Sequence, residues 1–311
     1  MKRILSTFLF TAAIACGQAV PVIFDTDMGN DIDDALALAM LHSLESRGEV
    51  KLLAVTVTKD NVWAARYVSA VNTFYGRGQV PVGIVKDGPT KGEGKYLRQA
   101  IEKGGWKYSD TKEEAVALLE RTLKSQADGS VVVVQVGFST NLARLLALPG
   151  GKELVRKKVK LLSLMAGDFT GAGPEYNVRE DVKSCRKVAD EWPTPMVWSG
   201  FEIGRTVKFP ARSIEHDFGW ASKNPVVDGY KAYMKFPYDR ETWDLTSVLY
   251  AVRPDGGYFG LSAAGEVQVD EKGNTRFEAA AGGRSRYLTW NDTQRARSLE
   301  ALVWLATQPA K

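Results

Sequence analysis

Apolar runs alternate with amphipathic stretches along most of the chain, which is the pattern of strands that alternate with helices. The apolar runs are short and nearly continuous, as expected for strands that are covered on both faces. The predicted strands span residues 20–24, 50–57, 80–85, 130–136, 160–167 and 195–200. The predicted helices span residues 35–44, 64–75, 113–126, 139–148 and 181–191. This order indicates an α/β fold with a mainly parallel central sheet and helices on both faces.

Polar side chains, many of them acidic, follow the predicted strands at the points where the strands end. Because ligands bind at the carboxyl ends of parallel strands, these residues are expected to share one rim of the sheet. A rim with so many carboxylates and almost no lysine needs a cation. Oxygen ligands suit a hard cation, either Ca²⁺ or Mg²⁺. In chain order, the residues are Asp25, Asp27, Asp33, Asp34, Asp60, Asn61, Val136, Ser139, Asn141, Asp168, Glu175, Asn177 and Glu202.

The composition of the 311-residue chain is that of an ordinary globular protein, with 44% hydrophobic and 25% charged residues. The formal net charge is only +4 and the basic residues are scattered, which argues against a nucleic-acid-binding surface. Residues 20–311 are expected to form a single domain, because no repeat or low-complexity linker interrupts them. Residues 86–106 are rich in glycine and lysine, and they are interpreted either as a loop that closes over a site or as a plain surface loop.

The first 19 residues have the pattern of a signal peptide. Lys2 and Arg3 precede an apolar run over residues 4–14 that is too short to span a bilayer. Small residues follow, and cleavage after Ala19 would give an exported, periplasmic or secreted protein without a transmembrane span. Cleavage before Cys16 would instead give a lipid-anchored protein. The only other cysteine is Cys185, so no internal disulfide is expected.

The segment VIFDTDMGNDIDDALALAML, residues 22–41, holds five aspartates within ten positions. Their spacing excludes an EF-hand, because the twelfth position of the loop is Leu36 where glutamate is required. A strand that runs into D-x-D also opens phosphatases of the haloacid dehalogenase type, with Asp25 as nucleophile and Asp27 as acid/base. That class gives no role to Asp33 and Asp34, which open the following helix.

A second interpretation explains more of the chain, which resembles the inosine-uridine-type nucleoside hydrolases. Their hallmark is a strand followed by D-x-D-P-G-x-D-D-A, and here it stands as DTDMGNDIDDA, with Met28 in place of proline and two inserted residues. Four further segments fit the family in the right order: LLAVTVTKDN, VVVVQVGFSTNLARLL, LSLMAGDFTGAGPEYNVRED and ETWDLTSVLYAV. The resemblance implies the family's Rossmann-like fold and hydrolysis of the N-glycosidic bond of a nucleoside, giving ribose and a free base.

The resemblance also implies a Ca²⁺ site and a catalytic residue. The ligands would be the carboxylates of Asp27, Asp34 and Asp244 and the backbone carbonyl of Val136. Asp27 would also be the general base that takes a proton from a metal-bound water. Asp31 lies in the two-residue insertion and has no counterpart, and a metal site with Asp31 on the ion and Asp33 in solvent would overturn this register.

The substrate would be a small nucleoside. The resemblance places Asp33, Asn61 and Asn177 at the 2′- and 3′-hydroxyls of ribose and Glu175 at its 5′ side. Many family members have a histidine just before the last aspartate that helps the base to leave, and Trp243 stands there. Tryptophan cannot transfer a proton near neutral pH, although it can stack on a base.

The missing histidine leaves several alternatives open. The leaving group could be activated by Tyr238, Asp239, Arg240, solvent or nothing, and Asp168 or Glu202 could replace a family amide that has no counterpart upstream of Glu175. The chain could also be a Ca²⁺-dependent sugar- or nucleoside-binding protein without activity. The sequence leaves open whether the chain forms a homo-oligomer.

Overall fold

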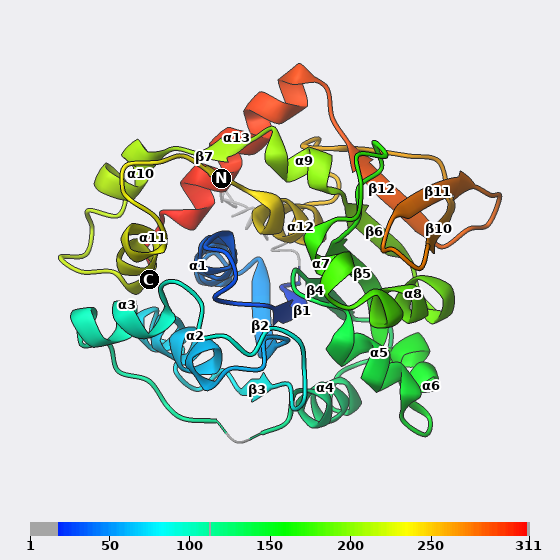
Figure 1. Cartoon of the computed structure of the whole chain (residues 1–311), viewed down its shortest axis with the longest axis horizontal. Helices are drawn as coiled ribbons and strands as arrows, with labels where there is room; N and C mark the ends of the chain where they lie inside the picture. The colour runs from blue at the N-terminus through cyan, green and yellow to red at the C-terminus, as the bar shows by residue number, and fades with distance from the viewer. Residues whose placement is uncertain (1–17, 112, 310–311) are drawn as a thin grey trace, which may run out of the picture.

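A ten-stranded sheet lies at the centre of the computed structural model, which describes residues 18–111 and 113–309 (Figure 1). All but two residues of the predicted signal peptide lie outside the described residues. The strand order is β11-β10-β12-β6-β5-β4-β1-β2-β3, with β9 added against β12. The strands are β1 (Val20–Thr26), β2 (Val50–Val57), β3 (Val82–Ile84), β4 (Val131–Gln135), β5 (Val159–Met165), β6 (Met196–Ser199), β9 (Gly260–Leu261), β10 (Gly265–Val269), β11 (Thr275–Ala279) and β12 (Ser285–Thr289).

The order of the parallel strands creates a switch point between β1 and β4. From β1 the chain continues to β2 and β3 on one side, and from β4 it continues to β5 and β6 on the other. In the register between the two strands, Phe24 faces Val134 and Asp25 faces Gln135. Crevices form at the carboxyl ends of strands whose connections diverge in this way. The residues that follow β1 and β4 are therefore the first candidates for a site.

Helices cover both faces of the sheet, because side chains of successive strand residues point to opposite faces. In β1, Val22 and Phe24 join one hydrophobic core, whereas Ile23 joins the other. The first core lies under α1 (Asp33–Ser46), α2 (Val62–Phe74), α3 (Leu97–Gly104), α11 (Pro225–Tyr233), α12 (Trp243–Val252) and α13 (Asp292–Ala306). The second lies under α4 (Ala115–Lys124), α5 (Thr140–Ala147), α6 (Gly151–Lys158), α7 (Tyr176–Glu180) and α8 (Val182–Glu191).

The part of the chain after residue 200 differs most from the sequence-based expectation, which gave no strand or helix bounds there and only the family segment ETWDLTSVLYAV. β12 pairs parallel with β6, and β10 and β11 extend the sheet in antiparallel fashion. Two short helices, α9 (Phe201–Arg205) and α10 (Ala211–His216), and a small sheet of β7 (Lys208–Phe209) and β8 (Arg240–Glu241) precede α12. These elements are too short to produce a clear periodicity.

The segment over residues 86–106 is not wholly a loop, because it contains α3. Leu97, Ala100 and Ile101 are buried on one face of that helix, while the segment before it is largely exposed. The three apolar positions were too few among glycine and lysine to indicate a helix. Within the described residues, no helix is long and apolar enough to cross a membrane.

Candidate active site

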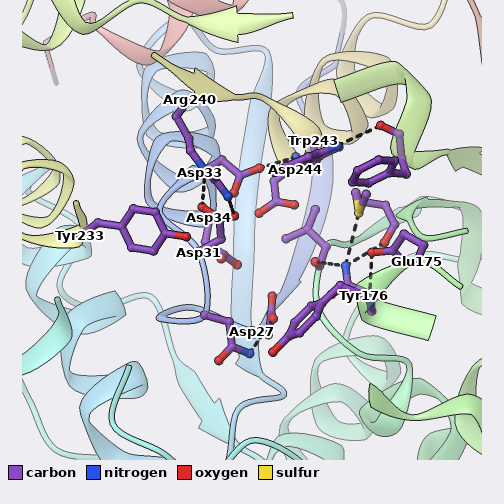
Figure 2. A pocket seen from close by; sticks show the side chains of 15 residues that line it. Asp27, Asp31, Asp33, Asp34, Glu175, Tyr176, Tyr233, Arg240, Trp243 and Asp244 are labelled. Atoms are coloured by element: carbon purple, nitrogen blue, oxygen red, sulfur yellow. Dashed lines mark hydrogen bonds and ion pairs between the residues drawn. The ribbon is translucent and has the colours of Figure 1, made fainter. Parts of the chain in front are cut away.

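A cavity of about 340 Å³ opens at the carboxyl ends of β1, β4, β5 and β6 (Figure 2). Its walls come from the loops that follow these strands and from the start of α12, so residues far apart in the sequence meet there. The lining residues are Asp27, Asn30, Asp31, Asp33, Asp34, Val136, Met165, Glu175, Tyr176, Asn177, Phe201, Tyr233, Arg240, Trp243 and Asp244. Eight of the nine site residues expected from the sequence are in this set.

An acidic cluster forms where the first turns of α1 and α12 meet. One carboxylate oxygen each of Asp33, Asp34 and Asp244 lies within 4.8 Å of the others, and all three side chains are buried. Both helices direct the positive end of their dipole at the cluster, which partly offsets its charge. The backbone N–H of Asp244 donates to Oδ2 of Asp33 at 3.1 Å, which ties the two helices together.

The cluster has the properties of a cation site. Oδ1 of Asp34 accepts a hydrogen bond from the hydroxyl of Thr26, but Oδ2 is buried without a partner among the described residues. Burial, and then repulsion from the neighbouring acids, raises the pKa of Asp33, Asp34 and Asp244 well above the ordinary range. Burial likewise raises the pKa of Asp27 to about 7. A hard divalent cation with oxygen ligands would satisfy these groups, so the residues present fit Ca²⁺.

The carbonyl of Val136 reaches the same cavity from the end of β4. Nδ2 of Asn177 donates to this carbonyl at 2.9 Å and to that of Met165 at 3.1 Å, which joins the ends of β4 and β5. A carbonyl oxygen has two lone pairs, so the bond from Asn177 leaves one for a cation. Asn177 and Val136 thus lie side by side at the cavity wall.

Glu175 is fixed at the beginning of α7. Its Oε1 accepts from the N–H of Asn177 at 2.8 Å, and its Oε2 accepts from those of Gly167 and Val178 at 3.1 and 3.2 Å. Burial raises its pKa to about 7, although these hydrogen bonds act in the opposite direction. The carboxylate lines the cavity, yet its main contacts in this structure are to the backbone.

The structure does not bring Asn61 into the cavity. Its side chain caps α2, with Oδ1 accepting from the N–H of Trp63 at 3.0 Å, and its Nδ2 donates to the carbonyl of Lys91 at 3.0 Å. Besides Asn177, the side-chain amide that lines the cavity is that of Asn30, in the turn that follows β1. The longer turn after β1 thus brings a different amide to the site.

Asn30 connects Asp27 with a buried lysine that sequence reasoning missed. Nδ2 of Asn30 donates to Oδ2 of Asp27 at 2.8 Å, and its Oδ1 accepts from Nζ of Lys59 at 2.7 Å. Lys59 is only 2% exposed, and it also donates to the carbonyl of Thr90 at 3.1 Å. The signal was present in the sequence, because Lys59 is the one basic residue between residues 52 and 65, directly after an apolar strand.

Asp31, which had no expected role, forms an ion pair with Arg240 at the cavity wall (Figure 2). Nε of Arg240 donates to Oδ1 of Asp31 at 2.8 Å, and Nη2 donates to Oδ2. Asp33 is 1% exposed within the acidic cluster, so the arrangement that would have overturned the predicted register is absent from the described residues.

Aromatic rings complete the wall beside Arg240. Trp243 and Phe201 are stacked with ring centroids 5.3 Å apart, and the indole N–H of Trp243 donates to the carbonyl of Phe201 at 2.9 Å. Because this N–H is occupied, Trp243 can offer a substrate its ring face only. A flat aromatic wall of this kind suits the stacking of a nucleobase.

Three other acidic residues that the sequence analysis considered, Asp25, Asp168 and Glu202, do not line the cavity. Asp25 lies within β1 and is fully buried, accepting from Thr56 at 2.6 Å and Asn141 at 2.8 Å, so it cannot reach a substrate as a phosphatase nucleophile would. Asp168 accepts from Thr170, and Glu202 accepts from the backbone of Phe169. Neither residue replaces the missing family amide at the cavity wall.

Comparisons of the sequence with known proteins find nucleoside hydrolases. The sequence model of the inosine-uridine preferring nucleoside hydrolases matches residues 22–304. The pyrimidine-specific ribonucleoside hydrolase RihA of Citrobacter koseri is 26% identical over 236 residues, which cover 67% of this chain and 68% of that protein.

Solved structures show the same fold. A plant nucleoside hydrolase, PpNRh1, superposes with a TM-score of 0.74 at 20% identity, covering 93% of this chain and 99% of its own. The purine-preferring ribonucleoside hydrolase of Gardnerella vaginalis has a TM-score of 0.71 at 18% identity, covering 92% of this chain and 99% of its own.

Proposed function

Because this chain belongs to the inosine-uridine preferring nucleoside hydrolase family and is an N-glycosyl hydrolase, we propose that it cleaves ribonucleosides in a Ca²⁺-dependent reaction with Asp27 as general base. The proposed ligands of Ca²⁺ are Asp34 and Asp244 from the acidic cluster, the carboxylate of Asp27, which lies outside that cluster, and the carbonyl of Val136. The third member of the cluster, Asp33, is proposed to face the ribose. The observation that carries the proposal is the buried, unpartnered Oδ2 of Asp34 within a cluster of buried carboxylates.

The proposed role of Asp27 follows from the way its carboxylate is held. Oδ2 is fixed by Asn30, so Oδ1 is the oxygen available to accept a proton from the attacking water. Ca²⁺, when bound, would lower the pKa of a water and hold it in the cavity. A positioned carboxylate that removes the proton contributes about 10² to 10⁴-fold to the rate.

The remaining polar groups are proposed to hold the ribose. Asp33 uses one oxygen for the N–H of Asp244, which leaves the other for a hydroxyl, and Asn177 and Glu175 line the neighbouring wall. The carboxylates around the sugar would also stabilise the positive charge that an oxocarbenium-like transition state builds on it. Asn61 does not line the cavity, so it is not proposed to contact the ribose.

Turnover of a nucleoside panel tests the proposal. Purified protein with 1 equivalent or more of added Ca²⁺ is expected to release reducing sugar from at least one of uridine, inosine, cytidine and adenosine. Binding of these nucleosides without release of sugar would favour the inactive sugar-binding alternative, and release of phosphate from phosphate esters would favour the phosphatase alternative.

We also propose that the protein is exported through its N-terminal segment. The basic start, the short apolar run and the small residues before Val20 support this proposal. Mass spectrometry of the protein recovered from the producing cell should show a chain that begins at Val20 or a lipid on Cys16. An intact N-terminus in the mature protein would contradict export by cleavage.

A further inference from the structure

Arg240 is the one basic side chain among the described residues that line the cavity. Figure 2 shows it above the acidic cluster, with Asp27 on the opposite side of the cavity. Arg240 lies on β8, and its partner Asp31 lies in the two-residue insertion after β1. The ion pair between them fixes the position of the guanidinium group. The other lining residues are acids, amides, tyrosines and apolar side chains, so Arg240 is the group that can stabilise a negative charge in the cavity.

The guanidinium group is held rigidly. Both oxygens of Asp31 accept from it, Oε2 of Glu241 accepts from Nη1 at 3.2 Å, and the side chain is 17% exposed. The rings of Tyr233 and Trp243 lie 5.3 and 5.1 Å from its central carbon. A donor fixed in advance costs no reorganisation when charge develops beside it, which is the condition for efficient electrostatic catalysis.

Arg240 still has hydrogen-bonding capacity for a ligand. Guanidinium has five N–H donors, and three are used in the bonds to Asp31 and Glu241. One N–H on Nη1 and one on Nη2 remain without a partner in the described part of the chain. Asp31 balances the formal charge of Arg240, but it occupies only one edge of the group.

Other groups at this wall are poorly suited to give a proton to the departing base. Burial and nearby carboxylates raise the pKa of Tyr233 and Tyr176, which makes both hydroxyls weaker acids. The hydroxyl of Tyr238 donates to the carbonyl of Tyr230 at 2.5 Å, and Oδ1 of Asp239 accepts from the N–H of Ala211 at 2.8 Å. Neither Tyr238 nor Asp239 lines the cavity.

The acids and histidines offer no alternative donor. Burial raises the pKa of Glu175 to about 7, but both of its oxygens accept backbone N–H bonds, which hold the carboxyl group against the start of α7 and not toward a departing base. His42 is buried against Asn72, and burial lowers its pKa to about 3. His216 lies at the end of α10, exposed and away from the cavity. The base therefore has to leave without a proton from these residues.

We propose that Arg240, positioned by Asp31, stabilises the leaving base as an anion. This inference rests on the proposed hydrolase function. In an oxo base such as hypoxanthine or uracil, the charge that develops on the ring nitrogen is shared with carbonyl oxygens, which are acceptors for the guanidinium. Adenine and cytosine present an amino group at the corresponding position.

The reaction balances without a protein acid. The bond between C1′ and the ring nitrogen breaks, and its electron pair stays on the base, beside Arg240. The water oxygen forms the new bond to C1′ and gives one proton to Asp27. After release, the base anion takes a proton from solvent and Asp27 returns its proton to solvent, so the net reaction consumes one water.

The test compares Arg240→Met with the wild type on natural nucleosides and on 4-nitrophenyl β-D-ribofuranoside, whose leaving group needs little stabilisation. Loss of one such donor costs about 10² to 10³-fold in kcat, so Arg240→Met should lose about that factor on inosine or uridine. Its loss on the nitrophenyl riboside should be at least about tenfold smaller.

Further variants separate a chemical role from a structural one. Arg240→Lys keeps the charge without the planar fork and should fall between wild type and Arg240→Met. Asp31→Asn should show a weaker form of the same dependence on the leaving group, as a positioning residue would. Arg205→Met removes an exposed arginine that lies 5.5 Å from the ring of Phe201, and this matched control should behave as the wild type.

The outcomes distinguish this inference from the proposed function. If the wild type cleaves none of these ribosides, the proposed function fails. If it cleaves them but Arg240→Met loses the same factor on every substrate, the function stands and the role of Arg240 is wrong. A leaving-group-dependent loss in Tyr233→Phe but not in Arg240→Met would assign the role to Tyr233 and would also overturn the inference.

Discussion

Replacing Asp27 with asparagine is expected to lower kcat by about 10² to 10⁴-fold, the range for loss of a general base. Asparagine keeps the shape of the side chain and one oxygen for the cation, but its amide cannot accept the proton of the attacking water. Steady-state kinetics should be measured at saturating Ca²⁺, because the substitution also removes part of a metal ligand. The KM should change much less than kcat.

Two groups of variants show whether this loss arises from the chemistry. Asn30→Ala and Lys59→Met leave the carboxylate of Asp27 in place but remove its support, so each should lower kcat less than Asp27→Asn does. Asp25→Asn, two residues before Asp27 in the chain, is the matched control, and it should reduce stability with kcat largely retained. A kcat for Asp27→Asn within tenfold of the wild type, or a far larger loss in Asp25→Asn, would contradict the assignment.

Removal of Ca²⁺ by a chelator is expected to abolish activity and to lower the melting temperature. Without a cation, the buried carboxyl groups of the cluster must either repel one another as anions or take up protons, and both cost free energy that the bound cation would remove. A ligand at 100 times its Kd stabilises the folded state by about 2.7 kcal/mol, which for a chain of this size is a shift of several degrees. Differential scanning calorimetry with chelator and with Ca²⁺ restored gives the shift, and equal melting temperatures would contradict it.

When a chelator has removed Ca²⁺, the free energy of unfolding is expected to decrease as the pH rises. Burial raises the pKa of Asp27 to about 7 in the folded chain, well above the value of about 3.9 for an unfolded aspartate. Between these values the folded state keeps a proton that the unfolded state releases, so the free energy of unfolding falls as the pH rises from about 4 to 7. Bound Ca²⁺ favours the ionised form, and it should weaken this dependence.

The sequence predicted the fold well where hydrophobic strands are long and buried on both faces. β2 has the predicted bounds, and β4 and β5 lie within a residue or two of them. The elements after residue 200 were missed because β7, β8 and β9 have two residues each and depend on pairing partners far away in the chain. β1 continues through Asp25, which sequence reasoning placed in the turn because of its charge.

Most of the candidate site could be predicted because its residues follow strands or open helices. Asp33 and Asp34 open α1, and Asp244 lies in the first turn of α12. The contacts of the insertion could not be predicted, because they join residues such as Asp31 and Arg240 that are 209 positions apart. Asn61 was predicted to contact ribose, but it caps α2. Sequence spacing cannot distinguish a side chain that caps a helix from one that faces a cavity.

We propose that Asp34 binds Ca²⁺ while its neighbour Asp33 faces the ribose. Isothermal titration calorimetry of Ca²⁺ into the chelator-treated wild type, Asp34→Asn and Asp33→Asn distinguishes these two roles. We predict one site per chain, lost in Asp34→Asn and largely retained in Asp33→Asn, which should instead have a raised KM. Retention of Ca²⁺ binding in Asp34→Asn, with its loss in Asp33→Asn, would contradict the assignment.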